Sequence, residues 1–483
     1  GCKARQMNLK RIILAAAVLG SSAGQSDGET AALPTQPNVI LIMADDLGYN
    51  DLSCFGSDVL RTPRLDKMAS EGMRLTSFYA GCTVCTPSRM ALLTGAYPAR
   101  VGWRGGVVGY GVKTVNGLAP EALTIAEVFK SAGYATGLCG KWHLGDQPVF
   151  LPTRQGFDSF LGLPYSDDMT RATGQRIGER LRGNRWPPLP LLENEHVIEA
   201  PADRNTLTQR ETAAAVKFIA ANRDNPFFLY LPHNMPGSSR APFASKAFRG
   251  KSKNGAWGDA VEELDWAAGE IFKALKKHGI DKRTIVIWTS DNGAPRRDPP
   301  QGSNGPLGGW GYTTAEGGMR VPAIVRWPGV IAANSTSDEL CSLMDLLPTF
   351  AKLAGAKLPG DRELDGRDIG PLLWGKPGAV SPHKAFFFYG RGQLQAVRSG
   401  DWKLFFTRDK LKPKGQPSTL YNLASDIGES ANVLSDHPAV AKRLAKLADE
   451  MRADLGDDLT GAKGSGTREP GFVKDAKPLT KRK

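Results

Sequence analysis

Short apolar runs alternate with amphipathic segments along most of this chain. Predominantly apolar runs occupy positions 38–44, 135–139, 227–231, 284–289 and 321–326, a pattern typical of strands buried on both faces of a sheet. Between these runs, residues 123–132, 206–222 and 260–278 repeat apolar side chains every three or four positions, as amphipathic helices do. This alternation predicts an α/β fold with a mostly parallel central sheet flanked by helices.

The pattern changes near Gly360. Residues 386–389, 394–398 and 402–407 are short apolar runs separated by glycine-containing turns, which predicts a smaller antiparallel sheet. Residues 439–455 are predicted to form a closing helix. We therefore expect a main domain over residues 37–374 and a C-terminal subdomain over 375–455. The tail at 456–483 is basic and rich in Gly, Lys and Pro, so we expect it to be disordered.

Residues 1–24 have the pattern of a secretory signal peptide. Lys10 and Arg11 precede an apolar stretch at 12–19, and small residues follow at 20–24. Residues 25–36 then form a polar linker. The apolar stretch is about half the length of a membrane span. We therefore expect an exported protein, periplasmic or secreted, without a stable membrane span.

The net charge of +13 over 483 residues raises the question of nucleic-acid binding. However, the first 11 residues contribute +4 and residues 463–483 contribute +5, which leaves only +4 for the rest of the chain. The basic character therefore lies mainly in the two ends, and we expect no nucleic-acid partner. Six cysteines are few for an exported chain of this length, so disulfides are not expected to be its main framework.

Polar side chains with catalytic or metal-binding chemistry follow four of the predicted strands. Parallel α/β sheets place ligands at the carboxyl ends of their strands, so we expect these side chains to meet at one edge. They are Asp45, Asp46, Lys141, His143, His233, Asp291 and Asn292. The carboxylate and amide oxygens of Asp45, Asp46, Asp291 and Asn292 are hard ligands, which suit Ca²⁺ or Mg²⁺ better than Zn²⁺.

The segment at 85–95 is predicted to be a short helix that begins at Cys85 and ends at Gly95. Unpaired N–H groups and the helix dipole favour negative charge at a helix N-terminus, which suits a nucleophile that attacks an anionic ester. Two simpler interpretations remain open. Cys85 could act as a thiolate with a lowered pKa, or it could form a disulfide with Cys82, whose spacing is that of a redox dithiol.

Taken together, the motifs resemble those of type I sulfatases, the formylglycine-dependent, arylsulfatase-like family. They are ADDLG at 44–48, CTPSRMALLTG at 85–95, GKWHLG at 140–145, SDNG at 290–293 and EGGMRVP at 316–322. AVRSGDWKLF at 396–405 and LYNLASDIGESANV at 420–433 resemble the C-terminal subdomain of the same family. The resemblance extends over residues 37–440 and implies an alkaline-phosphatase-like fold in which residues 37–374 are the catalytic domain.

The resemblance also implies a mechanism. In such sulfatases a separate maturase oxidises the cysteine of this motif to formylglycine, whose hydrate is the nucleophile. By match, that residue is Cys85, and Pro87 and Arg89 are the elements that the maturase reads. A hydrate has two hydroxyl groups on one carbon, so that one attacks sulfur and the other expels sulfate.

The same resemblance assigns roles to the residues around the nucleophile. Calcium would bind Asp45, Asp46, Asp291 and Asn292 and polarise the sulfate. Arg89 would stabilise the deprotonated hydrate, His143 would take a proton during sulfate release, and Lys141 would neutralise charge. Ser166 matches a position that contacts sulfate in some relatives.

The sequence departs from the family at two positions. Gly237 occupies the place of a histidine that helps to protonate the leaving oxygen, and Gly311 the place of a lysine that contacts sulfate. His233 lies four residues before the first of these places and is a candidate catalytic residue. The missing charge is expected to come from Arg240, Arg296 or Arg297, of which the last two are candidate substrate-binding residues.

We therefore expect hydrolysis of a sulfate ester, with a sulfated saccharide as the predicted substrate. The alternatives are a phosphonate or phosphate ester hydrolase on the same scaffold, and a sulfated-glycan binding protein that has lost catalysis. A thiol–disulfide protein based on Cys82 and Cys85 leaves Arg89 and the metal ligands without a role. Substrate choice is expected to depend on the loops at 165–201 and 240–258. The first is rich in arginine, which suits either an acidic saccharide or a solvated loop.

Overall fold

The structure is a computed structural model that describes residues 33, 35–109, 115–170, 187–298, 300–407, 418–477 and 479. The predicted signal peptide and most of the linker lie outside the described residues, as does most of the arginine-rich part of the first predicted substrate loop. The chain divides into Gly1–Leu33 and Pro34–Lys483, and the second unit is the subject of the description below. Among the described residues, no helix combines the length and the apolar composition that a membrane span requires.

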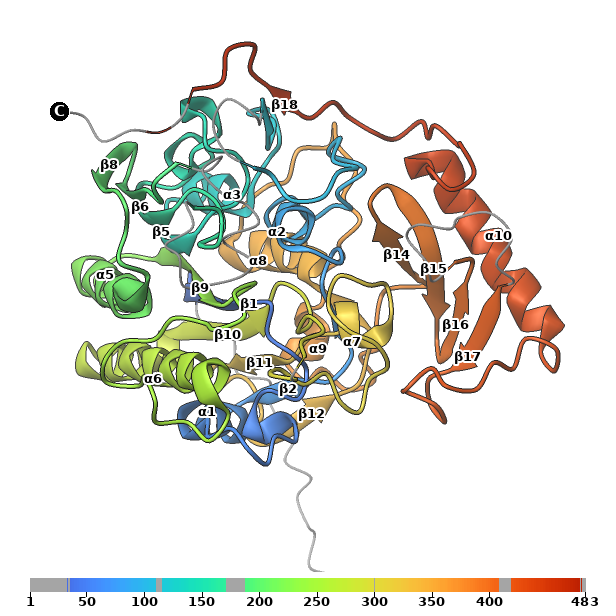
Figure 1. The fold of residues 1–483 in the computed structure, drawn as a ribbon, viewed down its shortest axis with the longest axis horizontal. Helices are drawn as coiled ribbons and strands as arrows, with labels where there is room; N and C mark the ends of the chain where they lie inside the picture. The colour runs from blue at the N-terminus through green and yellow to red at the C-terminus, as the bar shows by residue number, and fades with distance from the viewer. Residues whose placement is uncertain are drawn as a thin grey trace, which may run out of the picture. The chain divides into compact units, whose positions relative to one another are not determined.

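A ten-stranded sheet forms the centre of the described structure (Figure 1). Its strands run in the order β12 (Ser335–Ser337), β2 (Met73–Leu75), β11 (Ala323–Arg326), β10 (Thr284–Ser290), β1 (Asn38–Asp45), β9 (Phe227–Pro236), β5 (Ala135–Lys141), β6 (Ser159–Leu163), β7 (Leu191–Glu193) and β8 (His196–Glu199). Strands β10, β1, β9, β5 and β6 are parallel to one another. Strand β11 is antiparallel to β10, and β7 to β6. The predicted mostly parallel α/β sheet is confirmed.

Helices cover both faces of this sheet, which explains why β1 is apolar at every position from Val39 to Ala44. Alternate side chains of β1 enter different cores. Ile40 and Ile42 pack with the helices α1 (Pro63–Ser70), α5 (Leu207–Ala221) and α6 (Gly255–Lys277). Val39 and Leu41 pack with α2 (Cys85–Thr94), α3 (Ile125–Ser131) and α8 (Leu346–Ala354).

A second, smaller sheet follows toward the C-terminus (Figure 1). It consists of β14 (Phe386–Gly390), β15 (Gln393–Ser399), β16 (Trp402–Phe405) and β17 (Thr419–Asn422), each antiparallel to the next. Helix α10 (Pro438–Leu455) packs on it through Leu444, Ala448 and Leu455. The predicted C-terminal antiparallel sheet is therefore confirmed, and the predicted closing helix follows it.

Residues 456–477 of the tail are ordered in the structure, although the sequence predicts a disordered tail. Strand β18 (Gly471–Phe472) pairs with β4 (Asn116–Gly117) of the main domain. Further backbone bonds run from Arg468 N to the Arg100 carbonyl at 2.9 Å and from Val473 N to the Val115 carbonyl at 2.8 Å. The composition is that of a disordered tail, but backbone hydrogen bonds to a folded surface do not depend on composition. The prediction is wrong for this part of the tail.

A buried ionic cluster joins the C-terminal sheet to the main domain. Lys403 of β16 places Nζ 2.8 Å from Glu316 of α7 (Glu316–Met319) and 2.9 Å from Glu429. The same ammonium lies 3.8 Å from the centre of the Phe388 ring. Although burial opposes ionisation of Glu316, Lys403 together with Arg320 and Arg398 lowers the pKa of Glu316 to about 2. The cluster therefore keeps the carboxylate charged inside the protein.

Substitution of this lysine tests the cluster. We expect Lys403→Met to lower the free energy of unfolding by about 3–5 kcal/mol, because it leaves buried carboxylates without their cation. Urea unfolding followed by circular dichroism measures the change. Lys384→Met, at an exposed position, is the matched control and should change stability by less than about 0.5 kcal/mol. Equal stability of the two variants would contradict this role of the cluster.

Candidate active site

The carboxyl ends of the neighbouring strands β1 and β10 bring three aspartates together. The parallel register pairs Ala44 with Ser290, so that Asp45 and Asp291 lie next to each other where the two strands end. Asp46 follows with φ of 60° and donates its backbone N–H to Asp291 Oδ1 at 3.0 Å. All three side chains are completely buried. The structure therefore brings these three side chains together at one edge of the sheet, as the sequence predicts.

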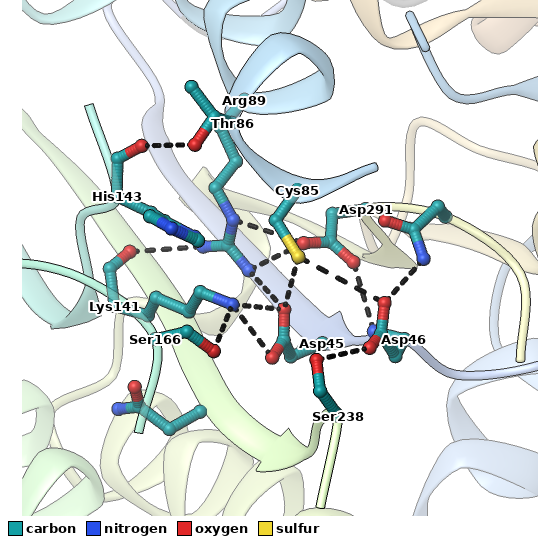
Figure 2. Close-up of polar contacts among 12 residues, drawn as sticks. Asp45, Asp46, Cys85, Thr86, Arg89, Lys141, His143, Ser166, Ser238 and Asp291 are labelled. Carbon is teal, nitrogen blue, oxygen red and sulfur yellow. Dashed lines mark hydrogen bonds and ion pairs between the residues drawn. The ribbon is translucent and has the colours of Figure 1, made fainter. Parts of the chain in front are cut away.

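Helix α2 begins at this edge of the sheet and directs Cys85 toward the aspartates (Figure 2). Its Sγ lies 3.4 Å from Asp45 Oδ1 and 4.0 Å from Asp46 Oδ1. Ser88 fixes the first turn of the helix to β10, because its hydroxyl donates to the Asp291 carbonyl at 2.6 Å. One ligand atom from each of Asp45, Asp46, Cys85 and Asp291 lies within 4.8 Å of the others. The side chain at position 85 and the acidic cluster therefore form one site.

Two buried cations hold the carboxylates in place (Figure 2). Arg89 donates from Nη2 to Asp291 at 2.8 Å and to Asp45 at 3.1 Å, and from Nη1 to the Lys141 carbonyl at 3.0 Å. Lys141 Nζ lies 2.7 and 2.8 Å from the two oxygens of Asp45 and 3.2 Å from Ser166 Oγ. With its described bonds directed at the carboxylates and at a backbone carbonyl, Arg89 orients the acidic cluster.

The electrostatics of the cluster fit a divalent cation. Burial, together with the neighbouring carboxylates, raises the pKa of Asp45 and Asp46. Burial acts in the same direction on Asp291, but Arg89 and Lys141 hold the pKa of Asp291 below its usual value. Three carboxylates thus face two cations. A dication would more than offset the one remaining negative charge and leave the site positive, and hard oxygen ligands favour Ca²⁺ or Mg²⁺.

Asn292 provides an independent sign of a metal. Its Nδ2 donates to Asp46 Oδ1 at 2.5 Å, while its Oδ1 is buried without a hydrogen-bond partner among the described residues. Buried amide oxygens are rarely unpartnered. The free lone pairs, beside three carboxylates, are what a fourth oxygen ligand would offer.

A cavity of about 430 Å³ opens above this cluster. Cys85, His143, Ser166, Asp168, Ser238, Arg297, Tyr312 and Arg391 contribute its polar lining, and Val84, Val107 and Met169 contribute apolar surface. The cavity is large enough for a small organic substrate. The residue predicted to be the nucleophile is thus accessible to such a substrate.

His143 has the protonation state of a base. Its Nε2 lies 3.0 Å from the Val108 carbonyl, which can only accept, so Nε2 carries the proton. In the neutral ring, Nδ1 then holds a free lone pair, and it is buried without a partner among the described residues. Burial, reinforced by Lys141 and Arg89, lowers the pKa of His143 well below its usual value. The imidazole is therefore neutral, and Nδ1 is the ring atom that can accept a proton.

Comparison with known proteins identifies this arrangement. The family model for sulfatases matches residues 37–356, and that for the C-terminal region of aryl-sulfatase matches residues 381–461. The chain belongs to the sulfatase family. It is a sulfuric ester hydrolase, and the resemblance noted from its motifs is confirmed.

Individual relatives extend over most of the chain. Human arylsulfatase A is 40% identical over 436 residues, which are 83% of this chain and 84% of that protein. Mouse steryl-sulfatase is 39% identical over 455 residues, which are 79% of this chain and 72% of that protein. Among solved structures, Ps i-CgsB in complex with k-i-k-neocarrahexaose matches with a TM-score of 0.72 and 30% identity, over 86% of this chain and 93% of that one.

Most of the residues predicted from the sequence lie at the site. The structure brings together Asp45, Asp46, Cys85, Arg89, Lys141, His143, Ser166, Asp291 and Asn292. His233 is not among them. Its Nδ1 lies 3.1 Å from Glu211 of α5, which also accepts a hydrogen bond from Asn234. His233 thus contacts the helix layer on one face of the sheet, and the structure does not support a catalytic role for it.

The two cysteine alternatives also fail. No disulfide joins Cys82 to Cys85 in the described structure, and Cys82 Sγ lies 3.3 Å from the Tyr389 carbonyl. Burial, together with Asp291 and Asp45, raises the pKa of the Cys85 thiol well above its usual value. The predicted lowering of this pKa at the helix N-terminus is therefore wrong, because burial and adjacent carboxylates outweigh the dipole. An unmodified Cys85 would be a poor nucleophile.

The backbone accounts for one of the departures from the family. At Gly311, an added Cβ would lie 2.1 Å from the Gly293 carbonyl oxygen, so a lysine there requires the backbone to move. The adjacent Tyr312, with φ of 70°, reaches the site instead and places its hydroxyl 2.5 Å from Asp46 Oδ2. Ser238, next to Gly237, donates to the same oxygen at 3.0 Å.

Sequence reasoning missed these two hydroxyl groups. The signal was present, since each hydroxyl residue directly follows one of the substituted positions, Gly311 and Gly237. Of the three arginines expected to supply the missing charge, only Arg297 lines the cavity. Arg240 and Arg296 are exposed and lie outside its lining.

The state of His143 leads to a pH prediction. Because its pKa is lowered, the imidazole stays neutral at pH 6, and kcat/KM for an aryl sulfate should show no acid limb near pH 6.5 that originates from this residue. We expect His143→Gln to lower kcat by about 10²–10⁴-fold without altering the melting temperature appreciably. A limb near pH 6.5 in the wild type that disappears in His143→Gln would contradict the assignment.

Proposed function

We propose that this enzyme is exported and removes sulfate from a carbohydrate, with a formylglycine at position 85 and Ca²⁺ held by Asp45, Asp46, Asp291 and Asn292. The observation that carries this proposal is the position of Cys85 Sγ, 3.4 Å from Asp45 at the start of a helix. The partnerless oxygen of Asn292 supports the metal. Export rests on the signal-peptide pattern at residues 1–24, which lies outside the described residues.

Residues around position 85 then have separate roles in the proposed reaction. The hydrate of formylglycine supplies two hydroxyl groups on one carbon, and Ca²⁺ supplies positive charge next to the sulfate. The positive end of the α2 dipole, at Cys85, attracts the anionic sulfate. Lys141, beside Ser166, stabilises charge that develops on the ester. His143 accepts at Nδ1 the proton that position 85 gives up when sulfate is released.

Two neutral hydroxyl groups lie next to the positions at which the family has a histidine and a lysine. Ser238 and Tyr312 lie 3.3 Å apart and both line the cavity. We infer that they hydrogen-bond the oxygen atoms of the bound sulfate ester. A hydroxyl is a weaker acid than imidazolium, so a good leaving group should be favoured more strongly here than where a histidine donates the proton.

The choice of a carbohydrate rests on the cavity lining and on a relative. Polar and charged side chains make up most of the lining residues, which suits a substrate with several hydroxyl groups. The solved Ps i-CgsB structure holds the oligosaccharide k-i-k-neocarrahexaose.

Mass spectrometry of position 85 tests the nucleophile. Trypsin releases the peptide at 75–89, which contains both Cys82 and Cys85. Conversion to formylglycine makes it about 18 Da lighter, and fragment ions should assign the loss to residue 85, with Cys82 unchanged as the internal control. Cys85→Ala should release no sulfate. An intact Cys85 thiol in fully active enzyme would overturn the proposal.

Loss of one carboxylate tests the metal. Asp291→Ala removes a ligand and a partner of Arg89, so we expect bound calcium, measured by elemental analysis after gel filtration, to fall together with activity, by about 100-fold or more. Asp298→Ala, at an exposed position, is the matched control. Full activity of the wild type after prolonged treatment with chelator would contradict the metal assignment.

A further inference from the structure

Two arginines in the cavity have no part in the chemistry described above. Arg89 and Lys141 already compensate the buried carboxylates. Arg297 and Arg391 line the same cavity from different parts of the fold, one from the loop after β10 and the other from the C-terminal sheet. We propose that they form a subsite for a second anionic group of the substrate. This inference rests on the proposed function and specifies its substrate class.

Arg391 is presented by a tightly constrained turn. It lies between β14 and β15 with φ of 52°, between Gly390 and Gly392. Asp458 N donates to the Gly392 carbonyl at 2.9 Å, and an added Cβ at Gly392 would lie 2.0 Å from an Asp458 oxygen. Asp457 accepts from Leu394 N at 3.0 Å on the other side of the turn. The segment after α10 therefore fixes the turn that carries Arg391 at the cavity.

The guanidinium of Arg391 is available to a ligand. The residue is exposed, and in the described part of the chain no hydrogen bond or ion pair connects it to another side chain. Arg297 is partly committed, because its guanidinium donates to the Ser238 carbonyl, but its Nε is buried without a partner among the described residues. The donors of the two side chains exceed what the protein itself satisfies.

An oxyanion with two or three oxygens is the matching ligand. Guanidinium groups bind carboxylate and sulfate through paired N–H···O bonds. A saccharide with one sulfate and no other charge would leave both arginines unpaired, whereas a uronate or a doubly sulfated sugar would satisfy them. Asp168, in the same lining, suits sugar hydroxyls, since carboxylates accept hydrogen bonds from them. The substrate class inferred is therefore a sulfated saccharide with a second anionic group.

Three small aryl sulfates test the subsite. 4-(Sulfooxy)phenylacetate and 4-(sulfooxy)phenylmethanesulfonate carry a second anion, and the N-methylamide of the first is the uncharged reference. The methylene spacer keeps the leaving groups similar. Dissociation constants are measured by calorimetry in the Cys85→Ala protein, which holds the probes without turnover, and kcat/KM is measured in the mature enzyme. The carboxylate and sulfonate arms distinguish the two kinds of anion.

We expect the charged probes to bind more tightly than the amide, and Arg391→Gln to reduce this preference by about tenfold. The change should appear in KM rather than kcat. Arg391→Lys should restore part of the preference, because it keeps the charge but loses the paired geometry. Arg249→Gln is the matched control, since it removes an exposed charge outside the cavity lining.

The outcomes separate the two proposals. An equal preference in the wild type and in Arg391→Gln, or no preference in either, would overturn the subsite. Failure of mature enzyme with verified formylglycine to hydrolyse any of the three probes would count against the proposed function, whereas an Arg391-dependent binding preference in Cys85→Ala would still support the subsite.

Discussion

The site depends on one constraint. Three carboxylates are buried without solvent contact at the ends of two adjacent strands. Burying Asp45, Asp46 and Asp291 side by side opposes folding, because desolvation and mutual repulsion both disfavour the ionised form. Arg89 and Lys141 offset this from α2 and β5. The cluster therefore ties the helix that bears position 85 to the central sheet. Ion pairs therefore position residue 85 as much as apolar packing does.

Backbone strain is concentrated at the same edge. Asp46, His143 and Tyr312 all have positive φ, at 60°, 64° and 70°. Asp and His tolerate this region better than most residues, but a tyrosine there is unusual. Each such residue costs about 1–3 kcal/mol, and the packed cores on both faces of the sheet maintain it. The strain turns the three side chains back over the strand ends, where a substrate is expected to bind.

Much of the fold and of the site was predictable from the sequence. Continuous apolar runs identified the buried strands, and the order of the motifs identified the residues around Cys85. The contact of His233 with α5 was not predictable, because both faces of β9 are buried and hydrophobic alternation does not reveal which face a polar residue joins. The ordered segment at 456–477 depends on backbone pairing with residues far away in sequence, which composition does not record.

Other members of the site required three-dimensional information. Tyr312 reaches Asp46 only because its backbone has a left-handed conformation, and no local pattern predicts that. Arg391 lies in the turn between β14 and β15 of the C-terminal sheet, far in sequence from position 85, and only the packing of that sheet brings it to the cavity. When tertiary packing alone brings a residue to a site, the sequence around that residue does not show that it belongs there.

The burial of α2 bears on whether the proposed conversion of Cys85 precedes or follows folding. Cys85 is 3% exposed, and Arg89 and the residues between them are buried as well. In the folded protein, a maturase of the kind that the motif implies could not reach Pro87 and Arg89, because both are buried and Arg89 is paired with carboxylates. The conversion proposed for position 85 would therefore have to precede folding, and a molecule that folded first would keep the unmodified thiol.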